Sequence, residues 1–431
     1  MPDKIPDSPQ FDLAEFSFVH LFWIQPFRRA MMFRKRLLGL KYVLYAILVL
    51  VFSFCALEVG LRIYDSRTGK ISGTDQPTSL ILAESWTTHH QLKPLLKLHI
   101  KNPDTGEFAL FRTNSIGLRG EEVAIPKPPG VFRIICLGDE TTLAPATDEK
   151  NTSSVLLARM LQKKSRQHIE VINAGVPGFC PLLSYLQVKH HLLQLEPDLL
   201  ILNIDMSDVA DDHRYRRYLK LDAAARPLVC SHPALREGKT TSFDQAQKRC
   251  LILSWCKLKW GAISDSMADQ AENSDIDSVR GTYAWLSDHP PDWSMYIDQA
   301  LSPIEELQRL AYRMDIGLIL AISPAPWQVA AQASNHKSVR TKYGVPQNTV
   351  FRSEKPFEII QNYARKRRIP IVNPLGTFRK NQHPEKLYLF RSARFSPSGH
   401  QVFAKSLAET IWQEIPSLKN GLANRKILSR K

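Results

Sequence analysis

The feature that most limits the fold of this chain is a repeated alternation of apolar strands and helices that begins at Val131. Five apolar runs stand out, namely "VFRIICL" (131–137), "IEVINAG" (169–175), "PDLLILNID" (197–205), "DIGLILAIS" (315–323) and "RIPIVNPL" (368–375). Near-continuous apolar runs are typical of strands that are buried on both faces, as in a parallel sheet. The pattern therefore predicts an α/β fold with a five-stranded parallel sheet covered by helices on both faces.

The segments between these runs have helical spacing. We expect helices near 152–164, over 182–195, from 303 onward, near 355–367 and over 398–415. Ser302, Pro303 and Glu305 stand in the order of a capping box with a first-turn proline. A long irregular insertion is expected over 209–296, with four tryptophans scattered through it, Trp255, Trp260, Trp285 and Trp293.

An apolar segment near the N-terminus predicts a membrane anchor. Residues 37–57, "LLGLKYVLYAILVLVFSFCAL", are apolar except for Lys41, which can snorkel to the interface. Basic residues between 28 and 36 precede it, so the positive-inside rule leaves residues 1–36 in the cytoplasm and the main domain outside, in the periplasm. A retained anchor is favoured over a cleaved signal peptide, because no A-x-A site follows, and over lipidation of Cys55, because bulky Phe54 precedes that cysteine. Met31 would make a more usual start than Met1.

The remaining boundaries follow from composition. Residues 66–130 are polar and rich in turn signals, which predicts a linker and a small β-rich lead-in with a turn at Asn114-Ser115. Residues 131–415 form the α/β domain, and residues 416–431 form a basic tail. The formal net charge of +15 favours anionic partners, such as an acidic glycan or a cell-envelope polymer. We expect no nucleic-acid partner, because no nucleic-acid-binding motif accompanies the charge.

The six cysteines contain no C-x-x-C pair, which argues against a zinc site. Outside the cytoplasm one disulfide among Cys230, Cys250 and Cys256 is plausible, and the sequence leaves the pairing open.

Four sequence blocks carry a family resemblance. Gly138-Asp139 follows the first strand, "NAGVPGF" (173–179) the second and an acidic loop the third, and "FSPSGH" (395–400) precedes the last helix. In this order they resemble the SGNH (GDSL) hydrolase family over roughly residues 107–412. The segment "FRTNSIGLRG…PKPPGVFRI" before them resembles the membrane-anchored bacterial branch. The resemblance implies a flavodoxin-like three-layer sandwich, a ligand site at the carboxyl ends of the strands, and ester hydrolysis without a cofactor.

The resemblance also implies a catalytic serine, histidine and aspartate, and none of these residue types stands at the corresponding position of this chain. Glu140 stands at the serine position, Arg394 at the histidine position and Arg391 at or near the aspartate position. A guanidinium does not give up its proton near neutral pH, so Arg394 cannot act as a general base. Glu140 and Arg394 are expected to form an ion pair that plugs the former cleft, with Arg391 close by.

Two positions correspond to the family's oxyanion hole. The resemblance assigns the backbone donor to Gly175, which is retained, and the amide side chain to Ser207, with Asn203 as the alternative.

Other chemistry could replace the lost triad. Thr141 and His400 are the candidate rescue pair for an active carbohydrate or acyl esterase. A hard-cation site at strand ends is a further alternative to ordinary loop acids, with the candidate ligands Asp139, Glu140, Asp205 and Asp208. The favoured expectation is that the chain holds neither a metal nor a cofactor.

Three functions remain open from the sequence. The favoured one is a membrane-anchored SGNH-type domain that has lost its triad and binds a glycan or an envelope polymer. The second is an active ester hydrolase of the O-acetylesterase type that uses non-standard residues. The third is a module in which Arg391 and Arg394 clamp a phosphate or carboxylate.

Overall fold

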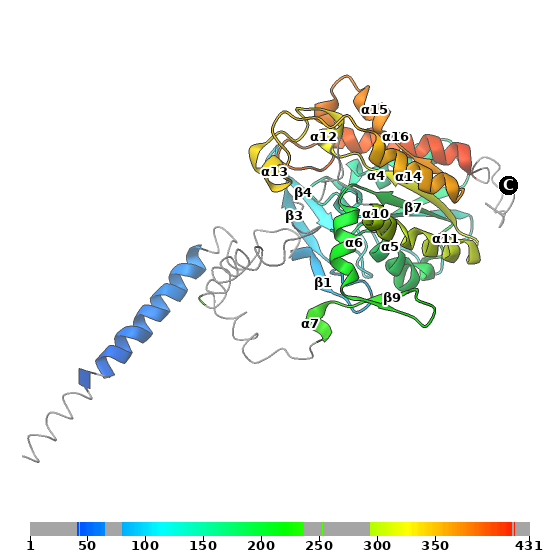
Figure 1. Cartoon of the computed structure of the whole chain (residues 1–431). Helices are drawn as coiled ribbons and strands as arrows, with labels where there is room; N and C mark the ends of the chain where they lie inside the picture. The colour runs from blue at the N-terminus through cyan, green and yellow to red at the C-terminus, as the bar shows by residue number, and fades with distance from the viewer. Residues whose placement is uncertain are drawn as a thin grey trace, which may run out of the picture. The chain divides into compact units, whose positions relative to one another are not determined.

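The computed structural model describes residues 41–42, 44–64, 80–236, 252, 294–415 and 418 (Figure 1). Two compact units divide the chain: one contains residues 1–75 and 242–260, and the other contains residues 76–241 and 261–431. The predicted cytoplasmic segment 1–36, the four tryptophans of the insertion, Cys250 and Cys256 all lie outside the described residues, as does nearly all of the basic tail.

In the first unit, the apolar segment forms one helix over Leu44–Tyr64. It has 21 residues and a mean hydropathy of 2.3, which makes it long and apolar enough to span a bilayer. The described helix ends later than the predicted segment 37–57, because Glu58 and Arg62 pair at 2.9 Å across one turn and continue it.

In the second unit, five parallel strands form one sheet in the order β11-β10-β7-β5-β6. The strands are β5 (Val131–Leu137), β6 (His168–Asn173), β7 (Leu199–Ile204), β10 (Gly317–Ile322) and β11 (Ile371–Val372). Each coincides with one predicted apolar run. In chain order the arrangement is 2-1-3-4-5, which is flavodoxin-like, so the predicted fold class is confirmed.

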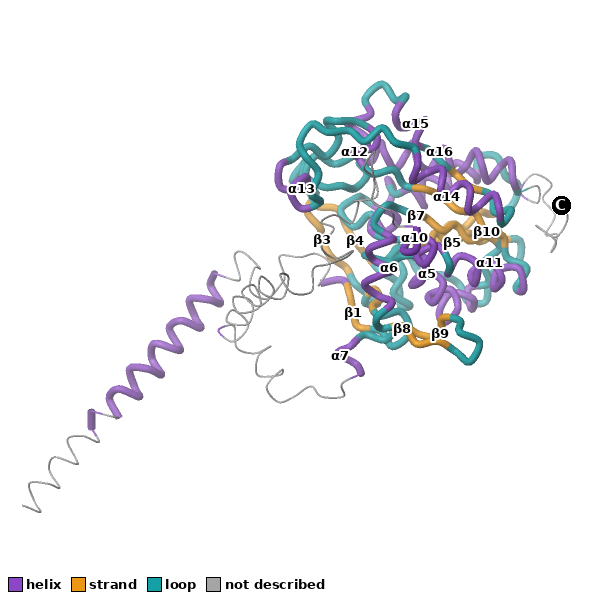
Figure 2. The backbone as a smooth tube through the Cα atoms, viewed as in Figure 1, coloured by secondary structure: helices purple, strands orange, loops and turns teal. Residues whose placement is uncertain are grey.

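Helices cover the sheet on both faces (Figure 2). On one face, α4 (Ser153–Gln162) packs against α16 (Pro397–Glu414). On the other, α5 (Pro181–Gln187) packs against α10 (Ser294–Leu301) and α11 (Pro303–Arg313). The helix α14 (Lys355–Lys366) joins this second layer, since the Tyr363 hydroxyl donates to the carbonyl of Leu301 at 2.8 Å.

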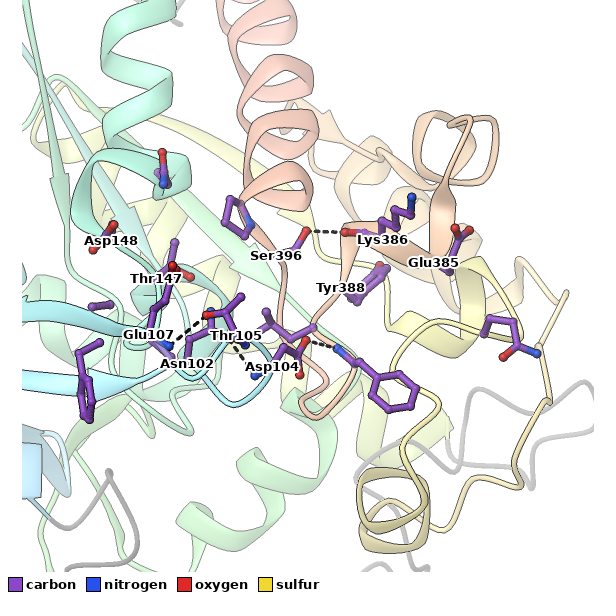
Figure 3. A pocket seen from close by; sticks show the side chains of 18 residues that line it. Asn102, Asp104, Thr105, Glu107, Thr147, Asp148, Glu385, Lys386, Tyr388 and Ser396 are labelled. Carbon is purple, nitrogen blue, oxygen red and sulfur yellow. Dashed lines mark hydrogen bonds between the residues drawn. The ribbon is translucent and has the colours of Figure 1, made fainter.

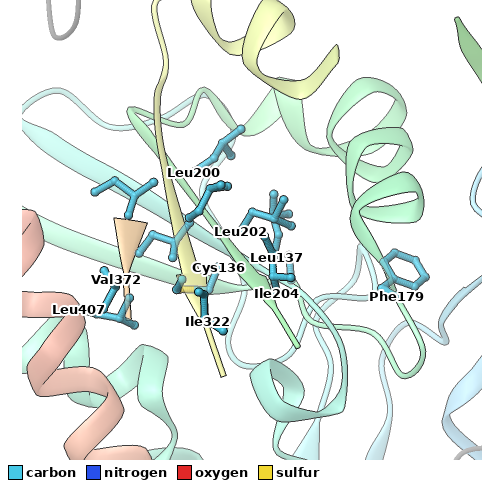
Figure 4. Packing of buried hydrophobic residues seen from close by; sticks show 14 of the residues in the cluster. Cys136, Leu137, Phe179, Leu200, Leu202, Ile204, Ile322, Val372 and Leu407 are labelled. Atoms are coloured by element: carbon cyan, nitrogen blue, oxygen red, sulfur yellow. The ribbon is translucent and has the colours of Figure 1, made fainter. Parts of the chain in front are cut away.

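The core lies between these layers. Side chains from the central strands and the flanking helices interdigitate, as Figure 4 shows for Leu137, Leu202, Ile322 and Leu407. Every residue of β7 and of β10 is buried, as expected for strands covered on both faces. This core fixes the carboxyl edge of the sheet, where the loops of the candidate site begin.

Short elements complete the second unit. The lead-in contains two antiparallel pairs, β1 (Leu82–Glu84) with β2 (His90–Leu92) and β3 (Lys97–Lys101) with β4 (Phe108–Arg112). The remaining helical elements are α3 (Glu140–Leu143), η1 (Glu149–Asn151), α6 (Asp208–Arg216), α7 (Pro233–Arg236), α12 (Pro326–Val329), α13 (Lys337–Lys342), α15 (Leu375–Arg379) and η5 (Pro384–Leu387).

The described part of the insertion is more regular than the sequence predicts. It begins with α6 and continues into an antiparallel pair, β8 (Leu219–Leu221) with β9 (Pro227–Cys230). This pair is held on the lead-in, because the amide of Cys230 donates to the carbonyl of Thr87 and the amide of His89 to the carbonyl of Cys230.

One local prediction needs refinement and another is wrong. The helix expected over 182–195 is present as one continuous helical run, whose winding changes from α5 to a π-helical turn η2 (Val188–Leu192) and a 3₁₀ turn η3 (Leu193–Leu195). Ser302 does not cap α11: its backbone is helical and its hydroxyl donates to the carbonyl of Gln299, because α10 runs almost directly into α11. The capping-box pattern is therefore present in sequence but unused.

Candidate functional site

The predicted site residues come from loops at the carboxyl edge of the sheet. Glu140 follows β5 as the first residue of α3, and Gly175 follows β6. Ser207 follows β7, and Arg394 lies in the loop before α16. Parallel strands end at one edge of a sheet, so these loops lie near one another.

The carboxylate of Glu140 is held by a backbone amide. The N–H of Gly178 donates to Glu140 Oε2 at 3.1 Å. The other oxygen, Oε1, lies 3.9 Å from Arg394 Nη2. That spacing allows Coulomb attraction but exceeds a hydrogen bond, so the pair is not bidentate. Both side chains are about 30% exposed, at 29% and 31%, so the contact partly fills the cleft and does not seal it.

Two histidines of the lead-in are connected to this amide by hydrogen bonds through the Pro177 carbonyl. His90 Nε2 lies 2.7 Å from the carbonyl oxygen of Pro177, which can only accept, so Nε2 carries the proton. His89 Nδ1 lies 3.0 Å from His90 Nδ1. Burial is the main reason that the pKa of His90 falls to about 4, so the ring is neutral at pH 7 and its Nδ1 accepts from His89.

A chain of hydrogen bonds therefore ends on Glu140. It runs from His89 through His90 to the Pro177–Gly178 peptide, whose N–H holds the carboxylate. Each bond polarises the next in the same direction, which strengthens the hold on the anion. His89 has a left-handed backbone with φ of 62°, a conformation that non-glycine residues adopt only at a cost.

Gly175 has a packing role in the structure. Its N–H donates to Asn173 Oδ1 at 3.0 Å, so it does not face the cleft. A Cβ at this position would lie 2.5 Å from the Leu143 amide nitrogen and 3.0 Å from the Asp139 carbonyl oxygen. A glycine is needed here because two backbones meet. The amide that faces Glu140 belongs instead to Gly178, three residues further on.

The predicted side-chain donor is also occupied. Both the N–H and the hydroxyl of Ser207 donate to Asp205 Oδ1 at 2.6 Å. The alternative, Asn203, accepts from the Ser323 hydroxyl at 2.8 Å and donates to Thr142 Oγ1 at 3.3 Å. The hydrogen bonds of Ser207 and Asn203 hold the loops after β5, β7 and β10 together.

Arg391 does not pair with Glu140 in the described part of the chain. Its side chain is exposed, and its backbone N–H donates to Asp104 at 2.8 Å. Among the described residues it forms no ion pair, so the expected cluster of two arginines around Glu140 is not formed.

The Thr141–His400 rescue pair is not assembled. The Thr141 amide donates to Asp139, which caps α3. His400 is buried in α16 and its Nδ1 lies 2.7 Å from the Ser153 hydroxyl on α4. Burial lowers the pKa of His400 to about 3, aided by the charge of Arg119, so the ring stays neutral and joins two helices.

Several buried acids surround the cleft floor. Burial, with the charge of Asp205, raises the pKa of Asp139 and of Asp208 well above the usual range, and burial raises that of Asp211 to about 7. Within the described residues no group of three or more His, Cys, Asp or Glu side chains is arranged to hold a metal ion. Asp139 and Asp208 accept from backbone amides, so their oxygens already serve the loops.

The lead-in also braces the loop that follows Glu140. The guanidinium of buried Arg119 donates to the carbonyls of Leu143, Ala144 and Thr147. Its backbone N–H donates to the carbonyl of Asn173 at the end of β6. The segment "GLRG" therefore fixes the position of the residue at the family's serine position.

Sequence reasoning missed Gly178 and the two histidines. The second glycine of "NAGVPGF" was a usable signal, because a glycine after a proline marks a turn whose amide can point outward. No pattern linked His89 and His90 to this loop, since His90 lies 87 residues before Pro177, at the start of β2 in a different sheet.

No family model matches the chain. No curated protein matches it either. Solved structures with a similar fold include a protein described as a lipolytic protein of the G-D-S-L family from Desulfitobacterium hafniense DCB-2, at 14% identity and a TM-score of 0.32, covering 64% of this chain and 98% of that one. An acetylxylan esterase from Geobacillus stearothermophilus has 14% identity and a TM-score of 0.34, with 65% and 94% covered. The lipase/acylhydrolase from Enterococcus faecalis has 13% identity and a TM-score of 0.33, with 65% and 95% covered.

Proposed function

We propose that this protein is a membrane-anchored, extracytoplasmic SGNH/GDSL-type domain that has lost hydrolase chemistry and binds a glycan or an envelope polymer. The helix Leu44–Tyr64 supports the anchor by its length and hydropathy. The five-stranded sheet and the order of its loops support the SGNH-type domain.

One observation carries the loss of catalysis. Glu140, at the position that the resemblance assigns to the nucleophilic serine, carries a carboxylate whose Oε2 accepts from the Gly178 amide. A resident anion at that amide repels a second anion and uses its donor. Arg394 stands where a base is needed and keeps its proton.

A carboxylate nucleophile does not restore the chemistry. Attack by Glu140 on an ester would give an anhydride, whose hydrolysis needs a general base near the acyl carbon. His90 is the nearest imidazole in the hydrogen-bond chain, and its Nε2–H is directed at the Pro177 carbonyl. The imidazole of His400 bonds Ser153. Neither ring is placed to deprotonate a water at Glu140.

The test is turnover of p-nitrophenyl acetate and of acetylated xylan by the purified full-length protein in detergent. We expect rates equal to those of heat-unfolded protein at the same concentration. Turnover that vanishes in a Thr141→Ala variant, while a control variant of the exposed Thr377 on α15, Thr377→Ala, keeps it, would restore the active esterase and contradict the proposal.

Binding is tested separately, by co-sedimentation of the full-length protein with cell-envelope glycan. Retention of the protein with the polymer supports the binding role, and its absence from every glycan pellet contradicts that role.

A further inference from the structure

A pocket of about 480 Å³ lies between the β3–β4 turn and the segment before α16 (Figure 3). One wall is the β3–β4 turn with Asn102, Thr105 and Glu107, and the opposite wall is the segment from Glu385 to Pro397. The loop Ala146–Asn151 forms the floor. Glu140, Gly178 and Arg394 do not line it.

The two walls are joined by one carboxylate. Asp104 accepts from the backbone N–H of Phe390 at 2.5 Å and from that of Arg391 at 2.8 Å. These bonds link residues 286 and 287 positions apart in sequence. The pocket is therefore a built feature of the fold and not a gap between loose loops.

Two exposed phenyl rings line the pocket. Phe108, at the start of β4, is 63% exposed, and Phe390, on the opposite wall, is 49% exposed. The Phe390 ring lies edge to face with the His336 ring, at 5.6 Å between centroids. Each phenyl ring offers a flat apolar face on which the C–H face of a sugar ring can lie.

Polar groups between the rings suit a polyhydroxyl ligand. The side-chain oxygen of Asn102 accepts from the amides of Asp104 and Thr105, so its NH₂ group is directed away from the turn. Within the described residues neither that NH₂ group nor the Asn151 side chain has a hydrogen-bond partner. Planar amides with unused donors are typical of sites that orient a ligand by its hydroxyls.

The charge of the lining selects among sugars. Four carboxylates line the pocket, those of Asp104, Glu107, Asp148 and Glu385, against one lysine, Lys386. Glu107 and Asp148 form no ion pair within the described part of the chain. This negative lining opposes the +15 of the whole chain and would repel uronic acids or phosphates. It attracts a protonated amine.

We propose that this pocket binds an oligosaccharide of amino sugars that carry free amines. The inference rests on the proposed glycan-binding function and names its site and its ligand class. The rings pack on the sugar faces, the amides of Asn102 and Asn151 bind hydroxyls, and Glu107 and Asp148 attract the ammonium groups. The acidic glycan predicted from net charge does not fit this lining.

Calorimetric titration of the full-length protein in detergent tests the proposal with three probes of equal length: a glucosamine tetramer, an N-acetylglucosamine tetramer and a galacturonate tetramer. We expect the glucosamine tetramer to bind most tightly. Phe108→Ala should weaken its binding roughly two- to five-fold, since the stacking contact of an exposed aromatic ring contributes about 0.5–1 kcal/mol. Tyr312→Ala is the matched control, because Tyr312 is 72% exposed and lies outside the pocket.

A second variant isolates charge. Glu107→Gln should weaken binding of the glucosamine tetramer and reduce its dependence on salt, while Glu84→Gln, an exposed acid on β1, should leave both unchanged. Thermal unfolding of each variant shows that the fold is intact.

The possible results distinguish a failure of the proposed pocket from a failure of the proposed glycan-binding function. Binding of envelope glycan that Phe108→Ala and Glu107→Gln leave unchanged overturns the site and leaves the proposed function standing. Tightest binding of the galacturonate tetramer overturns the ligand class. Failure of all three tetramers and of envelope glycan overturns both proposals.

Discussion

At the scale of single residues, the site is defined by which backbone amides face Glu140. Gly178 donates to its carboxylate, whereas Gly175 donates to Asn173. The order of the motifs predicted which loops meet. It could not predict which backbone N–H donates to the Glu140 carboxylate. The two glycines are three positions apart in one loop, and only the path of the backbone decides which N–H points outward.

Amide proton shifts distinguish the two glycines directly. In a spectrum of isotope-labelled protein, Glu140→Ala should move the Gly178 amide proton upfield, because it loses a charge-assisted hydrogen bond. The Gly175 amide proton should stay in place, since its partner Asn173 is untouched. A shift of the Gly175 amide proton with no shift of the Gly178 amide proton would contradict this assignment and favour Gly175 as the amide that faces Glu140.

Gly175 is expected to be essential for packing. An alanine Cβ would press on backbone atoms of Leu143 and Asp139, which cannot move without shifting α3. Gly175→Ala should therefore lower the free energy of unfolding by about 1–3 kcal/mol in urea titration. Gly376→Ala is the control: its Cβ would meet nothing within 4 Å in α15, so no loss is expected. Equal stability of the two variants would contradict this packing.

At the scale of elements, buried polar links hold helices and loops in register around the site. Apolar periodicity predicted the strands and most helices, because burial on both faces leaves a direct mark on sequence. It did not predict which polar residue joins which element. The order of Ser302 and Glu305 predicts a helix cap, but Ser302 does not cap α11 because α10 runs almost directly into it. The sequence also offers His400 as a possible base, but the hydrogen-bond partner of its ring is Ser153 on α4.

The link between α4 and α16 makes stability depend on pH. The pKa of His400 is about 3 in the folded state and near 6.5 in the unfolded chain. Between these values the unfolded chain binds a proton that the folded protein does not, so stability is full above pH 6.5 and falls as pH drops toward 3, by up to about 1.4 kcal/mol per pH unit. A Ser153→Ala/His400→Leu variant should lack this component. Other groups with shifted pKa values, including His89, His90 and Asp211, are present in both the wild type and the variant, so their contributions cancel in the difference.

The measurement is the difference in free energy of unfolding between wild type and variant from pH 8 to pH 4. We expect the wild type to lose stability relative to the variant as pH falls. A difference that is constant with pH would show that His400 is not buried as a neutral ring.

A single arginine organises the loop around α13. The guanidinium of buried Arg340 donates to five backbone carbonyls, those of Ala331, Ala333, Ser334, Pro346 and Thr349. It also lies 5.4 Å from the centroid of the Trp327 ring. A lysine has three donors and no planar fork, so Arg340→Lys leaves buried carbonyls unsatisfied and should cost roughly 3 kcal/mol. Arg309→Lys on the exposed face of α11 is the control. If Arg340→Lys lowers the free energy of unfolding in urea titration no more than Arg309→Lys does, the role of Arg340 in holding this loop is contradicted.

At the scale of the whole molecule, the chain combines an apolar helix with an α/β domain of flavodoxin-like order. The sequence predicted both, since each leaves a long signal: an apolar run of bilayer length and five buried strands. It did not predict the regular start of the insertion or its hydrogen bonds to the lead-in, because these contacts join segments far apart in sequence.

The anchor prediction is tested by fractionation. We expect the full-length protein to stay with membranes after an alkaline carbonate wash and a chain without residues 1–64 to be released. Alkaline phosphatase fused after Lys431 should be active, because the positive-inside rule places that end outside the cytoplasm. An inactive fusion with full expression would reverse the orientation.

The central claim is that no side chain at this site can act as an acyl-transfer nucleophile, and covalent labelling tests it most directly. The full-length protein is incubated with a fluorophosphonate at pH 7.5, and its intact mass is compared with that of a G-D-S-L esterase treated in parallel. The account predicts no adduct on this protein under conditions that label the esterase completely. A stoichiometric adduct on Thr141 or any hydroxyl beside Gly178 would contradict it.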